Sequence, residues 1–436
     1  MLLVFLLSII IFVGAYNKGE NDLTTLQQYP KSKWTLGVYM NGDNNLEASI
    51  TGGPTPPDQK RRKTLETYIA PGDFHFELAD LGSTSDVRVV ALIDRTPGYA
   101  DNMDNWNNTR LYYVEQGDYP DNSRGTYWIN KTSDEMNMAS SISLTWFLNT
   151  ILTKFPSEYT WISIYDHNWG WHEGWFQEDL TSNSETMNYA QLLSALQETS
   201  ISNNKKFDVV SYDACVSAQI EVLHTWRPYT EVFTGSQDYV GWGGVDYAAV
   251  LSLLHKNSSM TPADIGIAIA QSMLSDVDDH CSSSIRLNDG TFDEIVHQVN
   301  HLAQLFLKHF DNIHNDLISI RKKSPQTPNT VYDDMHRDLY GIAQATVELF
   351  EKQEGYEDII DCANKIMVAI NSAVIFNYVK KDHKSCLGGN GLSIYWPRSK
   401  TFQGEEKADY VSTSFAASTD WDEFLTVFNS LKSKAN

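Results

Sequence analysis

Two apolar segments, each ending in a chemically reactive side chain, limit the folds open to this chain. Residues 207–213 read Phe-Asp-Val-Val-Ser-Tyr-Asp and lead to Cys215, and residues 161–165 read Trp-Ile-Ser-Ile-Tyr and lead to Asp166 and His167. Short apolar runs of this kind are typical of buried strands in a parallel sheet. Open α/β sheets collect their functional groups at the carboxyl ends of such strands. We therefore expect Cys215 and His167 to belong to one site.

A cysteine and a histidine together suit nucleophilic chemistry. The thiolate is the reactive form of cysteine, and a nearby imidazole generates it. The separation of 48 residues (215 minus 167) is of the order of the roughly 50 residues between His and Cys in caspases. The alternative is that Cys215 only packs at a strand end, as most buried cysteines do.

The rest of the first half alternates between strand and helix patterns. Strands are predicted at 34–40, 87–93, 111–114 and 231–234, and helices at 140–154, 189–196 and behind Cys215. This alternation predicts an α/β fold with a mainly parallel sheet flanked by helices. The second half is more helical, with helices predicted from 261, at 291–310 behind a capping box, and at 332–351, 357–376 and 421–431. Residues 392–397 are predicted to be a buried strand stopped by proline.

These patterns predict four segments. Residues 1–15 resemble a signal peptide, because their apolar core of 12 residues (2–13) is too short to span a membrane. Residues 16–33 are polar and are predicted to be disordered. Residues 34–256 form the predicted α/β domain. Residues 257–436 form a helical region that packs on it and returns a strand (391–397) to the core.

Charge and cysteine content narrow the function. The net charge of −23 makes nucleic acid an improbable partner, because phosphate binding needs a basic surface. Sequons begin at Asn107, Asn130 and Asn257, which agrees with a secretory route and glycosylation. If Cys215 is a free thiol, the three remaining cysteines form at most one bridge. We expect a monomer, secreted or delivered to a lysosome or vacuole, with no stable membrane span after leader removal.

Five stretches of the chain resemble the clostripain-like cysteine peptidases, relatives of caspases, legumain, gingipains and separase. These stretches are 34–47, 159–171, 207–221, 235–251 and 391–397, and they occur in the order found in the family. The resemblance implies an endopeptidase of caspase-like fold. It also implies that His167 is the base and Cys215 the nucleophile, and that the backbone N–H groups of Cys215 and Asn168 hold the oxyanion.

The chain departs from the family pattern beside the histidine. Asn168 stands where the family has glycine, and asparagine tolerates left-handed backbone better than other residues with a side chain. Trp169 stands where a small residue is usual, and it either narrows the cleft or packs. His172 is a second candidate base, which we interpret as a surface or structural residue.

Asp213 matches the acidic residue with which family members select Arg or Lys before the scissile bond. A carboxylate at the floor of a pocket selects a cation directly. The alternative is an aspartate that caps the turn into the next helix. Asp238 and Asp246 are further candidates for the substrate pocket, although the segment around them lacks the usual Pro-Gly step.

The chemistry requires no cofactor, and calcium dependence is known in the family. Residues 101–108 are rich in Asp and Asn but lack EF-hand spacing, so we interpret them as a surface loop. Some family members are activated by cleavage at a basic residue between the histidine and the cysteine. Residues 179–186 contain no basic side chain, and between His167 and Cys215 the only ones besides His172 are Lys205 and Lys206. We therefore expect no activating self-cleavage within 179–186.

The sequence thus predicts a secreted cysteine endopeptidase that cleaves after Arg or Lys. Three alternatives stay open. An impaired relative that only binds peptides is motivated by Asn168 and Trp169. A transpeptidase or amidase on the same fold would capture the acyl-enzyme with an amine. A non-enzymatic surface protein rests only on the leader and the sequons.

Overall fold

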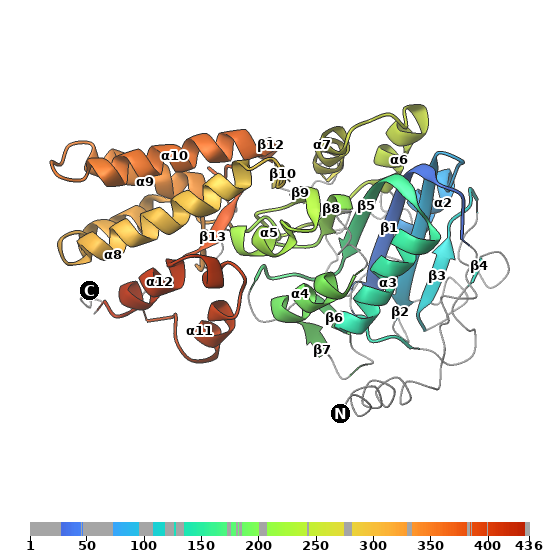
Figure 1. The fold of residues 1–436 in the computed structure, drawn as a ribbon, viewed down its shortest axis with the longest axis horizontal. Helices are drawn as coiled ribbons and strands as arrows, with labels where there is room; N and C mark the ends of the chain where they lie inside the picture. The colour runs from blue at the N-terminus through green and yellow to red at the C-terminus, as the bar shows by residue number, and fades with distance from the viewer. Residues whose placement is uncertain are drawn as a thin grey trace, which may run out of the picture.

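The fold is built around one large twisted sheet with helices on both faces and a helical extension at one end (Figure 1). The structure is a computed structural model. The model describes residues 28–44, 46, 73–95, 108–117, 126–127, 135–171, 176–179, 182, 185–199, 207–241, 244–273, 281–328, 334–381, 384, 386–398 and 400–431. The predicted signal peptide and the sequon positions Asn107 and Asn130 lie outside these residues. Asn257 lies within them and is exposed.

In the part of the chain described, the central sheet has nine strands in the order β12-β10-β9-β8-β5-β1-β2-β3-β4. The five strands from β9 to β2 are parallel, and antiparallel strands extend the sheet at both edges. The strands are β1 (Ser32–Gly42), β2 (Val87–Arg95), β3 (Arg110–Tyr113), β4 (Thr126–Tyr127), β5 (Ser157–Tyr165), β8 (Phe207–Asp213), β9 (Thr230–Gly235), β10 (Cys281–Arg286) and β12 (Val374–Val379). This confirms the predicted mainly parallel α/β fold.

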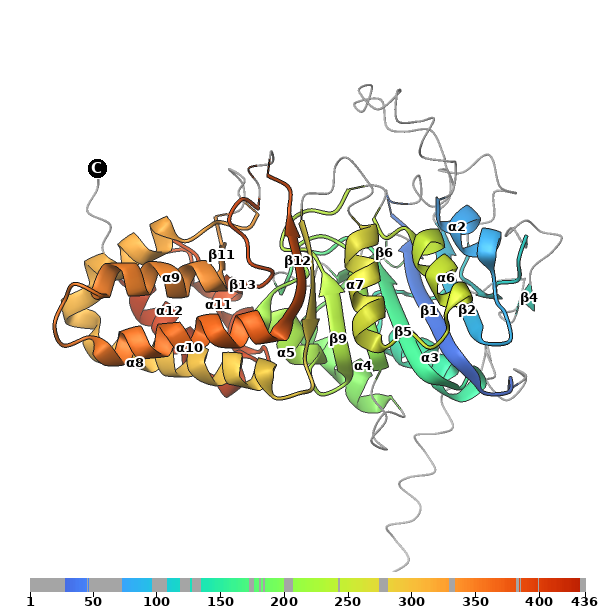
Figure 2. The same cartoon turned by 90° about the horizontal axis from the view of Figure 1, so that it is seen from above.

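Successive side chains of each strand point to opposite faces, so the sheet carries two apolar cores. Tyr39 packs in one core with helices α3, α4 and α5, and Val38 packs in the other with α2, α6 and α7. The helices are α2 (Asp73–Leu81), α3 (Ser141–Lys154), α4 (Tyr189–Glu198), α5 (Ile220–Trp226), α6 (Tyr247–Lys256) and α7 (Pro262–Ser272). Figure 2 shows α6 and α7 lying along one face of the sheet.

The helical extension continues the first of these cores without a break. It lies beyond the β12 end of the sheet (Figures 1 and 2). Its helices are α8 (Thr291–Lys323), α9 (Leu339–Phe350), α10 (Glu357–Ala373), α11 (Gly404–Val411), the 3-10 turn η4 (Ala416–Ser418) and α12 (Trp421–Asn429). Two small sheets accompany them, β6 (Phe176–Asp179) with β7 (Glu185–Met187), and β11 (His336–Asp338) with β13 (Ser393–Tyr395).

Several predicted boundaries differ from the structure. Strand β1 begins at Ser32, and Tyr29 stacks on Tyr113 with ring centroids 4.6 Å apart, so the end of the segment predicted to be disordered is packed. The predicted capping box at 291–294 is wrong, because Gly290 with a φ of 86° occupies the N-cap and makes no side-chain bond. Helix α8 also runs 13 residues past 310, to Lys323.

The C-terminal region contributes two strands, β10 and β12, to the central sheet, and the sequence pattern did not predict them. Strands β10 and β12 pair with each other at one sheet edge, and β10 lies beyond the predicted boundary at 256. The helix predicted at 357–376 ends at Ala373, where β12 begins, and the one predicted from 332 begins only at Leu339, after β11. The strand predicted at 392–397 is buried, but β13 pairs with β11 outside the central sheet. Within the described residues, no helix combines the length and apolarity needed to cross a membrane.

Candidate active site

The strand register gives His167 and Cys215 matching positions beyond two neighbouring strands. Strands β5 and β8 are parallel neighbours, and their last paired residues are Tyr165 and Asp213. His167 follows Tyr165 by two residues, and Cys215 follows Asp213 by two residues. Adjacent strands lie about 4.8 Å apart. The two residues therefore follow the same edge of the sheet at matching positions.

The residue before the histidine is fixed by the neighbouring strand β1. Both oxygens of the buried Asp166 carboxylate accept side-chain amide bonds, from Asn41 at 3.0 Å and from Asn44 at 2.7 Å. The His167 backbone N–H donates to the same carboxylate at 2.6 Å. These bonds orient the backbone that carries the imidazole.

Asn168 links the histidine loop to the cysteine loop through its side chain. Its Nδ2 donates to the backbone carbonyl of Cys215 at 2.8 Å, and the residue is only 1% exposed. The expected left-handed backbone is absent, because Val216 and Lys400 are the non-glycine residues with positive φ in the described part of the chain. The asparagine therefore supplies a buried bond between the two loops, where a glycine would supply only backbone freedom.

A second bond joins the same loops three residues further on. The backbone N–H of Trp171 donates to Oε1 of Gln219 at 3.1 Å. Gly170 between them has a φ of 74°, and a Cβ there would lie 2.2 Å from the Gln219 amide. Only glycine fits this turn, because both the backbone angle and the close approach exclude a side chain. The sequence analysis did not single out Gln219.

The cysteine loop is anchored on its other side by residues 236–240. Val216 has a φ of 48°, and its N–H donates to the carbonyl of Asp238 at 2.8 Å. The backbone N–H of Val240 lies 3.4 Å from Sγ of Cys215. A hydrogen bond from this N–H favours the thiolate form of the sulfur. The residue after the nucleophile is thus held in a rare backbone conformation by a defined partner.

Trp169 packs on a neighbouring ring and keeps part of its own ring exposed to solvent. It is 39% exposed, and its ring meets Tyr239 edge to face with centroids 5.6 Å apart. Tyr239 directly precedes Val240, which contacts Cys215. The two rings therefore form an aromatic rim next to the nucleophile. His172 lies outside the described residues.

Burial sets the protonation of the imidazole. Desolvation lowers the pKa of His167 below its ordinary value, because the charged form loses hydration. The imidazole is therefore neutral in the free protein at neutral pH. A neutral imidazole next to a thiol can accept its proton, which is the role of a general base.

Asp213 lies at the end of β8 with its carboxylate enclosed by residues 244–247. Its Oδ2 accepts the backbone N–H of Val245 at 3.2 Å and lies 3.4 Å from the Tyr247 hydroxyl. A Cβ on Gly244 would lie 2.1 Å from Oδ1, so glycine is required above this oxygen. Burial raises the pKa of Asp213 to about 7. Asp213 does not cap the next helix. Helix α5 begins at Ile220, its N-cap is Gln219, and no side-chain hydrogen bond caps it.

The other two candidate carboxylates have different surroundings. Asp246 is the N-cap of α6, and its side chain accepts the backbone N–H of Ala249 at 2.8 Å. Asp238 is fully buried and lies with Cys281 and Cys386 in a cluster whose ligand atoms are all within 4.8 Å of one another. Asp246 therefore caps a helix, and Asp238 lies next to two thiols.

A group of three carboxylates offers a place for a hard cation. Oxygen atoms of Asp43, Asp94 and Glu135 lie within 4.8 Å of one another at the ends of β1 and β2. Calcium prefers carboxylate oxygens, so the donor set fits this ion. Asp43 directly precedes Asn44, which holds Asp166 beside His167. An ion bound there would support the histidine loop.

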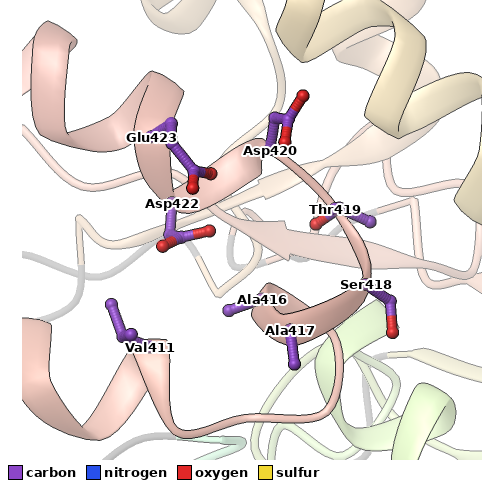
Figure 3. Close-up of a pocket in the computed structure, with 8 residues that line it drawn as sticks. All are labelled: Val411, Ala416, Ala417, Ser418, Thr419, Asp420, Asp422 and Glu423. Carbon is purple, nitrogen blue, oxygen red and sulfur yellow. The ribbon is translucent and has the colours of Figure 1, made fainter.

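A hollow in the helical extension shares no residue with this site. Its volume is about 450 Å³, and its lining includes Val411, Asp420, Asp422 and Glu423. Figure 3 shows Asp422 and Glu423 on the side opposite Ala416 and Ala417. Burial and the hydrogen bond to Glu423 raise the pKa of Asp422 to about 6.

The fold is shared with solved structures of cysteine proteases. A secreted C11 cysteine protease from Bacteroides thetaiotaomicron, in complex with an irreversible peptide inhibitor, matches with a TM-score of 0.61 and 16% identity over 90% of this chain and all of that one. An inactive zymogen C11 protease from Parabacteroides distasonis matches with a TM-score of 0.59 and 17% identity over 90% and 99%. The chain therefore shares the caspase-like fold of these solved structures.

Sequence comparison names the family. The profile of the clostripain family matches residues 70–428, so the chain belongs to the clostripain family of peptidases. Clostripain of Hathewaya histolytica is 21% identical over 442 residues, which cover 87% of this chain and 78% of clostripain. The resemblance drawn from five sequence stretches is confirmed.

Proposed function

We propose that this protein is a cysteine endopeptidase in which Cys215 is the nucleophile and His167 the general base and acid. The observation that carries the proposal is the equal offset of both residues beyond the paired strands β5 and β8. The bond from Asn168 to the Cys215 carbonyl supports it, because it ties the two loops at a fixed distance.

In the proposed reaction, His167 accepts the thiol proton and the Cys215 sulfur attacks the scissile carbonyl carbon. The oxyanion that forms is held by the backbone N–H groups of Cys215 and Asn168. His167 then gives its proton to the leaving amine, and the acyl-enzyme remains. Water, deprotonated by His167, attacks the thioester and releases the second product. The lowered pKa of His167 suits a group that must be neutral before the first step.

We propose Asp213 as the residue that selects Arg or Lys before the scissile bond. Its Oδ1 lies close to the backbone of Gly244. This approach is possible because glycine has no side chain there. A bound guanidinium would offset the cost of ionising this buried carboxyl, whose pKa is about 7. Asp246 and Asp238 are weaker candidates, because the first caps α6 and the second faces Cys281 and Cys386.

The proposal is tested with fluorogenic peptides that place Arg, Lys, Asn or Asp before the scissile bond. Cleavage after Arg or Lys that is lost in Cys215→Ala and in His167→Ala, but kept in Cys362→Ser, supports the dyad. Cleavage after Asn or Asp alone would keep the dyad and exclude the pocket role of Asp213. A folded, calcium-supplied protein that cleaves none of them would instead be a peptide-binding relative.

We also propose secretion, since one matched relative is described as secreted. That description favours secretion over a lysosome or vacuole. Calcium is proposed as a supporting ion at Asp43, Asp94 and Glu135. Chelation should then lower activity, and added calcium should restore it in the wild type but not in Asp94→Asn. Equal activity with and without chelator would exclude the ion.

A further inference from the structure

Two buried cysteines outside the candidate active site face each other across a sheet edge. Cys281 is the first residue of β10 and is 4% exposed, and Cys386 lies in the loop after β12 and is fully buried. Their sulfur atoms lie within 4.8 Å of each other and of a carboxylate oxygen of Asp238. Strands β10 and β12 are antiparallel partners, with Cys281 opposite Val379. The chain thus returns to the start of β10 seven residues after Val379.

The environment of this pair differs from that of the other two cysteines. The Cys386 sulfur has both the Cys281 sulfur and a carboxylate oxygen of Asp238 within 4.8 Å. Oγ of Ser236 lies 3.5 Å from the Cys281 sulfur and donates to the Cys281 carbonyl at 2.8 Å. Cys362, by contrast, donates to the backbone carbonyl of Gln298 at 3.2 Å on the inner face of α10. Cys281 and Cys386 therefore lie close enough to each other to be candidates for a bridge.

We infer that Cys281 and Cys386 form a disulfide bond when the chain folds in an oxidising thiol–disulfide environment. With glutathione disulfide as the oxidant, a thiolate of the pair attacks one glutathione sulfur and releases one reduced glutathione. The second cysteine then attacks the mixed disulfide and releases the other. Two protein S–H bonds and one glutathione S–S bond are lost, and one protein S–S bond and two glutathione thiols form. Because this occurs during folding, burial in the final structure does not block it.

The bridge would support the segment that contacts the nucleophile. In the loop after Cys386, the N–H of Gly391 donates to Oε1 of Gln237 at 2.7 Å, and Gln237 also donates to Asp338 at 3.1 Å. Gln237 lies three residues before Val240, whose N–H is 3.4 Å from Sγ of Cys215. A covalent bond between Cys386 and β10 would therefore stabilise residues 236–240, which contact the cysteine loop.

The test is thiol mapping of the full chain carrying Cys215→Ala, which prevents self-digestion and reaction at the nucleophile. The protein is refolded in glutathione redox buffer, alkylated without reduction, and digested for mass spectrometry. The expected result is a cross-linked Cys281–Cys386 peptide with Cys362 alkylated. Alkylation of all three cysteines, or any other pairing, would overturn the inference. Thiols protected without a cross-link and released by a zinc chelator would also overturn it, in favour of a metal site with Asp238.

A second measurement tests the supporting role independently of activity. The bridge closes a loop of 105 residues (386 minus 281), so reduction should lower the thermal midpoint by an amount on the order of 5–10 °C. Cys281→Ser/Cys386→Ser should show the low midpoint with or without reductant, and the matched control Cys362→Ser should keep the reductant-dependent difference. An unchanged midpoint on reducing the mapped bridge would remove the supporting role. Neither measurement depends on the proposed peptidase mechanism.

Discussion

The side chain of Asn168 should matter more for catalysis than its backbone. In Asn168→Ala the 2.8 Å bond to the Cys215 carbonyl is lost. Leaving a buried acceptor unpaired costs about 1–3 kcal/mol. If that cost falls on the catalytic arrangement of the cysteine loop, kcat/KM should fall about 10-fold, within a range of roughly 5- to 100-fold. Because the bond touches no substrate, the loss should appear mainly in kcat.

The assay is steady-state hydrolysis of the best peptide from the panel, with a thermal unfolding curve for each variant. Asn168→Gly restores the residue that is usual in the family, yet it should lose at least as much activity as Asn168→Ala. The control is Gln353→Ala, which removes an amide bond to the Leu349 carbonyl (3.0 Å) in the helical extension and should lower stability without changing kcat. Wild-type kcat in both Asn168 variants would refute the reasoning.

Three further predictions concern buried titratable groups. Asp213→Asn should abolish the preference for Arg and Lys. In the wild type, kcat/KM for an Arg peptide should rise with pH through about 7 as this carboxyl ionises. A flat profile in pH-rate measurements would contradict this. Burial raises the pKa of Glu221 to about 7. Between about pH 4.5 and 7 the native protein therefore keeps a proton on this carboxyl that the unfolded protein has lost. The free energy of unfolding should fall as pH rises through this range. Glu221→Gln should remove up to about 3 kcal/mol of that fall in urea unfolding series, and an unchanged pH slope would contradict it. Because burial lowers the pKa of His167, the acid limb of kcat/KM that remains in Asp213→Asn should lie below the ordinary histidine range, and a remaining limb above 6.5 would exclude His167 as its source.

The strand core, and the positions of His167 and Cys215 just beyond the carboxyl ends of β5 and β8, could be predicted from the sequence because both follow from local patterns. Apolar runs mark buried strands, and the residue after such a run lies at the sheet edge whatever the strand order. The support of Asp166 by Asn41 could not be predicted, because it requires that β1 and β5 be neighbours in a given register. Strand order is a tertiary property that no short window of sequence contains.

The missed elements have specific physical reasons. Strand β10 reads Cys-Ser-Ser-Ser-Ile-Arg, and its serines are buried with partners that only the fold supplies, such as the Gly391 carbonyl for Ser283 at 2.7 Å. Strand β12 continues directly from α10, so no turn residue marks the change. The role of Asn168 was misread because the pattern offers only a substitution for glycine, whereas the side-chain bond depends on the position of Cys215.

The helical extension is part of the candidate active site rather than a separate unit behind it. The buried Glu221, six residues after Cys215, accepts the backbone N–H of Tyr395 at 3.0 Å and the hydroxyl of Tyr410 at 2.9 Å. Gln237, on the other side of the cysteine loop, donates to Ser393 at 2.9 Å. Without residues 393–410 these buried polar groups would lose their partners, at a cost of about 1–3 kcal/mol each. The segments that flank Cys215 therefore reach their observed conformation only when the C-terminal region is in place, and the predicted boundary at 256 divides the sequence but not the folded unit.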